Sequence, residues 1–248
     1  MNIDTYRKTQ KFFYHCYFKI YHRLKVIGLE NIPDGAALIV AHHEGGYDLD
    51  NHAISCCHPT RDIHVLDWDK YHYINSMWGR YILVGGIPLW LRGGIRWKYI
   101  NPYLHKKGSQ YPSLVCIFPE GNSGTFLNRH ILWKFFPGVV RIALKYKIPI
   151  VPTALIGFQK ASPILISIEQ EHGPADPIYF PLINLPFKLK IEFGTSFELD
   201  NFYDKKLTRE EEFWIANRVI RPKIAKLCMK HRKVQLQKVD FKMKRPDF

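Results

Sequence analysis

The sequence has few cysteines, and their placement suits neither a structural metal site nor a disulfide framework. No C-x-x-C pair occurs, which argues against a zinc site of the usual spacing. The number of cysteines is odd and no secretory leader precedes them, so we expect reduced thiols and a cytoplasmic setting. The five are Cys16, Cys56, Cys57, Cys116 and Cys228.

Long apolar runs and linkers are also missing. The longest apolar candidates, 81–91 and 148–158, are broken by Gly or Pro, and both fall short of the ~20 residues of a membrane span. We therefore predict no transmembrane segment. No Ser/Gly-rich linker and no internal repeat interrupts the chain, which favours a single domain.

Acidic residues are too few to balance the basic ones. Lys and Arg number 36 and Asp and Glu 22, which gives a formal net charge of +14. Such a charge suits an anionic partner, whether a phospholipid surface, a nucleic acid or a phosphorylated substrate. Hydrophobic residues make up 46% of the chain and aromatic residues 15%, so a substantial core is expected.

The two ends of the chain differ from its middle. Residues 1–24 predict an amphipathic helix, helical over 5–24, with Phe13, Tyr17 and Ile20 on an apolar face and lysines and histidines opposite. That composition is typical of a helix lying on a membrane and equally of a helix packed on its own domain. Residues 25–229 form the predicted domain. The tail 230–248 holds seven basic residues against two acidic ones, and we expect it to be solvated and mobile.

Between these ends, apolar strand patterns alternate with helical ones. Strands are predicted at 36–41, 62–67, 113–118 and 148–156, and helices at 51–57 and 138–146. This alternation indicates an α/β fold with a mixed, largely parallel sheet flanked by helices. A later strand at 188–193 alternates with charges and is expected at a sheet edge. A capping box at Thr208–Glu211 predicts the start of a C-terminal helix.

The strongest candidate for chemistry lies directly after the first of these strands. His43 follows the strand end at 36–41, and Gly45 and Gly46 allow the chain to turn sharply there. Sites in α/β proteins lie at strand ends of this kind. Asp48, five residues beyond His43, is placed to accept a hydrogen bond from His43 Nδ1, which leaves Nε2 as a general base.

His43-x4-Asp48 is the first of four sequence blocks. The second, third and fourth follow in order: Gly86-Ile-Pro-Leu-Trp-Leu-Arg92, Phe118-Pro-Glu-Gly121 and Ile148-Pro-Ile-Val-Pro152. In this order the four blocks resemble the glycerolipid acyltransferase family, which includes lysophosphatidate and glycerol-3-phosphate acyltransferases, and the resemblance covers 25–194. The sequence departs from the usual family pattern at four positions: His42 stands where Asn is usual, Gly45 where Ser is, Pro88 where Ile or Phe is, and Ser123 where Arg is.

The resemblance implies an O-acyltransferase of phospholipid biosynthesis. It would move a fatty acyl group from a thioester, acyl-CoA or acyl-carrier protein, to a glycerolipid hydroxyl, with lysophosphatidate or another lysophospholipid as the favoured acceptor. His43 with Asp48 supplies the base that a neutral alcohol needs, and direct attack requires no acyl-enzyme. The glycine-rich turns near Gly45 and after Phe118 are expected to offer N–H groups to the oxyanion.

The acceptor is expected to contact three further positions. Arg92 suits a phosphate because guanidinium binds it with two parallel hydrogen bonds, and Arg96 or Lys98 is placed to assist. Glu120 and Gly121 of the third block are candidate substrate-binding residues, with Glu120 contacting a glycerol hydroxyl or orienting Arg92.

No cofactor or metal is expected beyond the acyl-CoA or acyl-ACP co-substrate. We expect peripheral contact with an anionic membrane, on its cytoplasmic face, and no nucleic-acid partner. Three alternatives stay open: an unphosphorylated lipid acceptor, a non-catalytic anionic-lipid-binding protein, and a metal-dependent hydrolase. The hydrolase would use the ligand cluster His42, His43, Asp48, Asp50 and His52.

Overall fold

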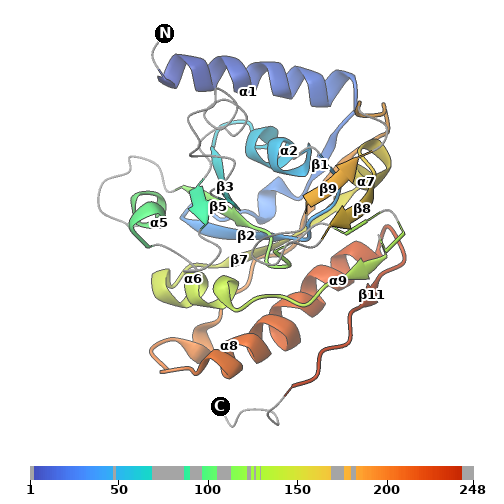
Figure 1. Cartoon of the computed structure of the whole chain (residues 1–248). Helices are drawn as coiled ribbons and strands as arrows, with labels where there is room; N and C mark the ends of the chain where they lie inside the picture. The colour runs from blue at the N-terminus through green and yellow to red at the C-terminus, as the bar shows by residue number, and fades with distance from the viewer. Residues whose placement is uncertain are drawn as a thin grey trace.

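A seven-stranded sheet runs through the centre of the protein (Figure 1). The computed structural model describes residues 3–46, 49–68, 87–89, 97–104, 113–121, 124–125, 127–128, 130–168, 176–179 and 183–241. Neighbouring strands are parallel except for the antiparallel pair β10–β7, which confirms the predicted mixed, largely parallel sheet. In sheet order, the strands are β1 (Lys25–Ile27), β10 (Lys190–Phe193), β7 (Ile150–Ile156), β2 (Ala37–Ala41), β5 (Leu114–Ile117), β3 (Ile63–Trp68) and β4 (Ile87–Leu89).

Strand β2 lies in the middle of this sheet and is buried along its whole length. Its side chains alternate between two cores: Leu38 and Val40 join one, and Ala37, Ile39 and Ala41 join the other. A strand covered on both faces has no solvent side, which is why its sequence is continuously apolar. The predicted strand at 36–41 is confirmed.

Helices cover both faces of the sheet (Figure 1). Buried residues of α1 (Ile3–Ile20), α2 (Leu49–Cys57) and α7 (Phe158–Ala161) share one core with the odd-numbered residues of β2. Buried residues of α5 (Trp97–Leu104), α6 (Gly138–Tyr146), α8 (Arg209–Ile215) and α9 (Arg221–Met229) share the other. The first and last helical layers therefore lie on opposite sides of the sheet.

Helix α1 is present as predicted, but it ends at Ile20, and the face that packs overlaps the predicted apolar face only in part: Tyr17 packs against the core as expected. Phe18 is 1% exposed and belongs to the core, and the Tyr14 ring stacks on His52 of α2 with centroids 4.7 Å apart. Phe13 and Ile20, expected on the packed face, are 67% and 76% exposed. The helix carries aromatic residues on several sides, so its own pattern does not decide which side meets the domain.

Crossing a bilayer demands a helix of about 20 mostly apolar residues. Within the part of the chain that the structure describes, no helix is both long enough and apolar enough to meet that demand.

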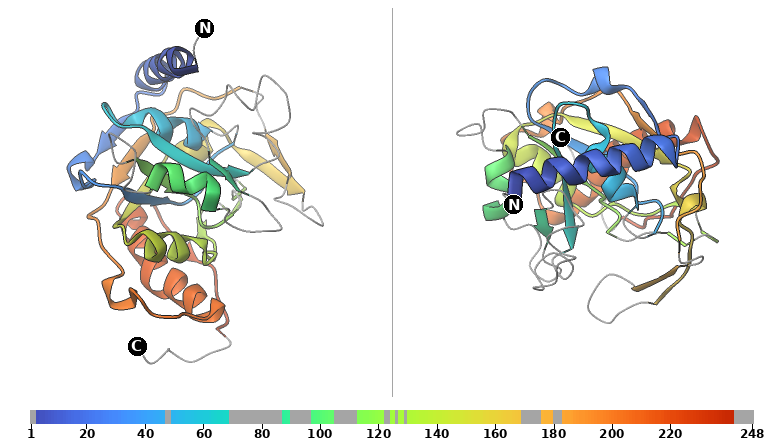
Figure 2. Two further views of the ribbon diagram at one scale, coloured as in Figure 1. Left: turned by 90° about the vertical axis from the view of Figure 1, so that its left-hand side faces the viewer. Right: turned by 90° about the horizontal axis from the view of Figure 1, so that it is seen from above.

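Two smaller pairings complete the fold. Strands β8 (Ile164–Ile168) and β9 (Asp176–Tyr179) form an antiparallel hairpin that extends from the body (Figure 2). Strand β11 (Gln235–Leu236) pairs in parallel with β6 (Ile131–Leu132). The stretch that contains β11 is exposed, as expected of a solvated tail, but the expectation that it is mobile is wrong, because its backbone is held by β6. Residues 242–248 lie outside the described residues.

Strand β10 also departs from expectation. It is not an edge strand, because it lies between β1 and β7. Ile191 and Phe193 are buried, while Glu192 pairs with Lys230 and His231 beyond the end of α9. Of the charges that suggested an edge, Glu192 is thus neutralised by the C-terminal segment.

The C-terminal helical layer begins at the predicted capping box. Thr208 Oγ1 accepts a hydrogen bond from the Glu211 N–H at 3.2 Å, and Glu211 accepts one from the Thr208 N–H at 2.6 Å. A π-helical turn, η3 (Ala216–Ile220), then joins α8 to α9. Pro222 lies in the first turn of α9. The proline thus restarts the helix, in agreement with its inability to donate within a helix interior.

We predict that Thr208→Ala lowers the free energy of unfolding by about 1 kcal/mol, because the first turn of α8 loses its cap. Chemical denaturation followed by circular dichroism measures the change. Thr195→Ala, at an exposed position outside the helices, is the matched control and should leave the midpoint unchanged. An unchanged midpoint for Thr208→Ala would show that the cap contributes nothing to stability.

Candidate active site

The site lies where β2 and its parallel neighbours end. The carboxyl ends of adjacent parallel strands meet at one edge of a sheet, so the loop after β2 lies beside the loop after β5. A hydrogen bond joins the two loops: the His43 N–H donates to Glu120 Oε1 at 3.0 Å. The second strand end therefore fixes the backbone of the histidine predicted to act as base.

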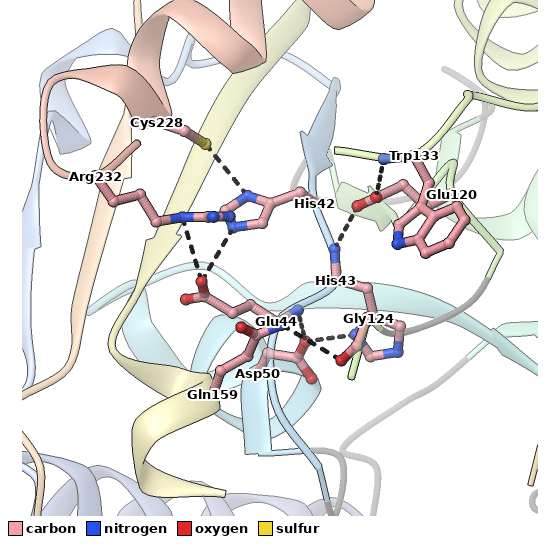
Figure 3. A network of polar contacts seen from close by, with 10 residues as sticks. All are labelled: His42, His43, Glu44, Asp50, Glu120, Gly124, Trp133, Gln159, Cys228 and Arg232. Atoms are coloured by element: carbon pink, nitrogen blue, oxygen red, sulfur yellow. Dashed lines mark hydrogen bonds and ion pairs between the residues drawn. The ribbon is translucent and has the colours of Figure 1, made fainter. Parts of the chain in front are cut away.

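The His43 side chain is held by a buried carboxylate. Its Nδ1 contacts Asp50 Oδ2, and the Asp50 side chain is fully buried (Figure 3). The same oxygen accepts the Glu44 N–H at 2.8 Å, and Oδ1 accepts the Asn51 N–H at 2.9 Å. A carboxylate oxygen accepts a hydrogen bond from the ring, so this contact keeps the proton of a neutral imidazole on His43 Nδ1. Nε2 is then the basic nitrogen of the ring.

Asp50 holds the position for which the sequence suggested Asp48. Asp48 itself lies outside the described residues. Helix α2 begins at Leu49, so Asp50 sits in its first turn, where a carboxylate is also favoured by the helix dipole. The five-residue spacing pointed to Asp48, so Asp50 was predicted only as a potential metal ligand. The start of the helix immediately before Asp50 was the signal available to identify it.

The environment of His43 is half-buried and apolar on one side. The side chain is 19% exposed, and its ring lies 4.7 Å from that of Phe118, centroid to centroid. Phe118 follows β5 and opens the third sequence block, so this block contributes both a ring and a carboxylate to the His43 turn. The first and third sequence blocks therefore lie side by side in the structure.

Glu120 is 6% exposed and uses both carboxylate oxygens on backbone donors. Besides the His43 N–H, the Trp133 N–H donates to Oε2 at 2.7 Å. Burial raises the pKa of Glu120, while the nearby His42 and the two backbone donors oppose that rise. The carboxylate thus ties the His43 loop to the segment after β6. This role for Glu120 was not predicted from the sequence, which suggested contact with substrate or with Arg92.

Two of the glycines in these turns already use their N–H groups within the protein. The Gly121 N–H donates to the Phe118 oxygen at 3.1 Å, and the Gly46 N–H donates to the Ser162 oxygen at 2.8 Å. Gly121 is exposed and has a φ of +69°, which closes the turn after the third block. In this structure neither amide is directed to an oxyanion.

A second polar cluster lies on the other side of the His43 backbone. His42 Nδ1 is 3.4 Å from Cys228 Sγ, and its Nε2 is 3.8 Å from Glu44 Oε1. Arg232 Nε lies 3.3 Å from the same Glu44 oxygen (Figure 3). Burial lowers the pKa of His42, but Cys228 and Glu44 outweigh it and raise the pKa overall. None of these partners was predicted from the sequence.

The potential metal ligands proposed from the sequence face different partners. Within the described ranges, no three His, Cys, Asp or Glu side chains are grouped so as to hold a metal ion. His42 is directed to Cys228, His43 to Asp50, and His52 stacks on Tyr14. The geometry of these residues therefore gives no support to the hydrolase alternative.

The second sequence block is only partly described. Arg92 and Arg96 lie outside the described residues, so their predicted contact with a phosphate stays a prediction. Lys98, named as a possible assistant, is exposed on α5.

Comparison with a protein-family model gives one match over the site and most of the sheet. Residues 23–156 match the family described as Acyltransferase. The matched range begins before β1 and ends with β7, so it contains His43, Asp50 and Glu120.

The chain is also similar to curated relatives and to a solved structure. An uncharacterized protein of Mycobacterium tuberculosis is 32% identical over 72% of this chain and 53% of its own length, and one of Mycobacterium leprae is 29% identical over 73% and 53%. The chain thus spans about half the length of these relatives. The 1-acyl-sn-glycerophosphate acyltransferase PlsC of Thermotoga maritima superimposes with a TM-score of 0.53 at 18% identity, covering 94% of this chain and 81% of that one.

Proposed function

Since this chain belongs to the Acyltransferase family, we propose that it transfers a fatty acyl group from a thioester to a hydroxyl of a glycerolipid, with His43 as the base. The observation that carries this proposal is the His43–Asp50 pair at the end of β2. The protein with the matching fold in Thermotoga maritima is described as acting on 1-acyl-sn-glycerophosphate. That description makes a lysophosphatidate-like acceptor the first one to test here.

In the proposed reaction the acceptor hydroxyl loses its proton to His43 Nε2 as its oxygen attacks the thioester carbonyl. The tetrahedral intermediate collapses, the new ester forms, and the carbon–sulfur bond breaks. The leaving thiolate takes the proton from His43 and is released as the thiol of CoA or of an acyl-carrier protein. Asp50 supports the imidazolium that exists between these two proton transfers. The proposed steps need no metal or other cofactor.

The direct test is an assay with radiolabelled acyl-CoA and a panel of lysolipids, with and without EDTA. We predict that His43→Ala and Asp50→Asn each lower kcat by ~10² or more, because the base or its correct tautomer is lost. Asp48→Asn is the matched variant and should have a smaller effect. Activity is expected to be the same in EDTA.

The outcomes separate the two carboxylates. A greater loss in Asp48→Asn than in Asp50→Asn would restore the spacing expected from the sequence. Near-normal turnover by a folded His43→Ala protein would refute the mechanism, and absence of product with every acceptor would refute the proposed activity.

We propose that Arg92 binds a phosphate on the acceptor. Arg92→Lys should lower kcat/KM for lysophosphatidate by roughly tenfold, because one of two charge-assisted hydrogen bonds is lost, and it should change kcat/KM for a monoacylglycerol much less. Arg209→Lys, at an exposed position on α8, is the control. An equal loss on both acceptors would favour the unphosphorylated lipid instead.

Membrane contact is proposed through α1 and the segment beside its C-terminal end. Phe12, Phe13 and Ile20 are 66%, 67% and 76% exposed, and Lys8, His15 and Lys19 are exposed on the same helix. Tyr21 donates to the Asn184 oxygen at 2.7 Å, which brings the exposed Ile183 and Phe187 next to this end of the helix. Exposed aromatic and aliphatic side chains among basic ones are typical of a surface that binds anionic lipid.

Replacing Phe12, Phe13 and Ile20 by Gln should weaken binding to vesicles that contain anionic phospholipid by at least about tenfold, because each side chain contributes about 1 kcal/mol or more when buried in lipid. Wild-type binding should also weaken as salt rises. Sedimentation with vesicles measures both. Deleting the helix is unsuitable, since Phe18 and His22 are buried in the domain.

The control is Met229→Gln, which removes an exposed apolar side chain from α9 on the opposite side of the sheet. It should bind vesicles as the wild type does. Unchanged binding by the triple variant would exclude α1 as the membrane contact.

A further inference from the structure

We propose that the segment after α9 is a positioning element of the active site, and that Arg232 orients the His43–Asp50 pair through Glu44. This inference rests on the proposed role of His43 as base. It concerns a part of the chain that lies beyond the residues matched to the family and at the far end of the sequence from His43.

Glu44 is part of the His43–Asp50 arrangement through its backbone. The Glu44 N–H donates at 2.8 Å to Asp50 Oδ2, the same oxygen that contacts His43 Nδ1. A rotation of the Glu44 backbone would therefore disturb the oxygen on which the histidine tautomer depends. Contacts that hold Glu44 in place therefore also hold the His43–Asp50 pair in place.

The Glu44 side chain is fixed by the C-terminal segment. It is 3% exposed, and a carboxylate so deeply buried is costly unless a positive group pairs with it. Arg232 Nε lies 3.3 Å from Glu44 Oε1, and the Arg232 side chain is itself only 16% exposed. The ion pair is thus largely shielded from water, where charge pairing is strong.

His42, on the other side of His43, contacts the same region. Its Nδ1 is 3.4 Å from Cys228 Sγ near the end of α9. In Figure 3 the side chains of His42 and Glu44 point toward Cys228 and Arg232, while the His43 ring points the other way, toward Asp50. Of the two residues that flank His43, Glu44 is therefore anchored on the segment after α9, and His42 on the last turn of α9 itself.

The segment after α9 is itself held by the β6 region, which contacts Glu120. The Gln235 N–H donates to the His130 oxygen at 2.7 Å, and the Gln237 N–H donates to the Leu132 oxygen at 3.0 Å. Trp133, which follows directly, donates its N–H to Glu120, and Glu120 accepts the His43 N–H. The segment thus connects the Glu44 side of the loop with the Glu120 side.

The test is steady-state kinetics of acyl transfer by the full-length chain carrying Arg232→Gln. We expect kcat to fall roughly 10- to 100-fold, because a small displacement of a catalytic group has an effect of that size. The KM values for acyl donor and acceptor should stay within about twofold, since a residue that acts through Glu44 changes the rate and not the binding of either substrate. Arg232→Lys, which keeps a charge, should retain part of the lost rate.

The double variant Glu44→Gln/Arg232→Gln covers the case in which Arg232→Gln fails to fold. It removes the Glu44 and Arg232 charges together, so it should fold more readily than Arg232→Gln, and its kcat should exceed that of Arg232→Gln, a coupling expected of residues in contact. Rates are expressed per folded molecule, with the folded fraction measured by thermal denaturation. Lys233→Gln removes the adjacent, exposed charge and is the control.

The result that would overturn the inference is a folded Arg232→Gln protein with the wild-type kcat, or a loss that disappears once rates are expressed per folded molecule. A test of the proposed function is separate, because it depends on wild-type activity and on His43→Ala. A wild-type enzyme that is active and sensitive to His43→Ala, but indifferent to Arg232, would leave the function standing and remove this inference alone.

Discussion

A carboxylate without water needs hydrogen-bond donors, and the structure around His43 is arranged to supply them. Asp50 is fully buried and receives the Glu44 and Asn51 N–H groups together with His43 Nδ1. Because each donor comes from the loop between β2 and α2 or from the first turn of α2, satisfying this carboxylate forces the loop into one shape. The orientation of the imidazole follows from that shape, so local packing alone does not have to supply it.

The same requirement explains why distant parts of the chain meet here. Glu120 and Glu44 are also buried, and each has a partner from outside the loop. Glu120 takes a donor from the residue after β6, and Glu44 takes its cation from the segment after α9. Parallel strand order brings β2 and β5 side by side, and the buried carboxylates then require the β6 and C-terminal segments to close on them.

The sequence predicted well what depends on local pattern. The apolar run at 36–41, the helix at Gly138–Tyr146 and the capping box at Thr208 were all confirmed, since burial on both faces, 3.6-residue periodicity and side-chain capping are each visible in a few consecutive residues. His43 likewise lies just after the end of a strand, as the apolar run at 36–41 predicted. These features need no knowledge of what packs against them.

What the sequence did not predict depends on contacts across long separations. Three such features are the interior position of β10, the pairing of β11 with β6 and the ion pair of Arg232 with Glu44. Each joins segments that are far apart in the chain, and neither segment's own sequence indicates its partner. Charged residues after Lys230 suggested a solvated tail because their partners, Glu192 and Glu44, lie far away in sequence. The contact between His43 and Asp50 was missed on a smaller scale, because it depends on where one helix begins; Asp48 lies outside the described residues, and its role stays a prediction.

Two departures from the usual family pattern have a common physical basis in this loop. Gly45 stands where the resemblance would place Ser. Its φ is +105°, and a Cβ atom added at this position would lie only 3.1 Å from Phe158, so a side chain there would be strained and crowded. His42 stands where Asn is usual, and its longer side chain reaches Cys228 on α9 and approaches Glu44.

The tight turn at Gly45 brings the loop against α7, and the long side chain of His42 brings it against α9. The loop is therefore held between the two helical layers at the point where His43 projects. Gly45 and His42, the two departures from the family motif, are the residues that make these contacts with α7 and α9.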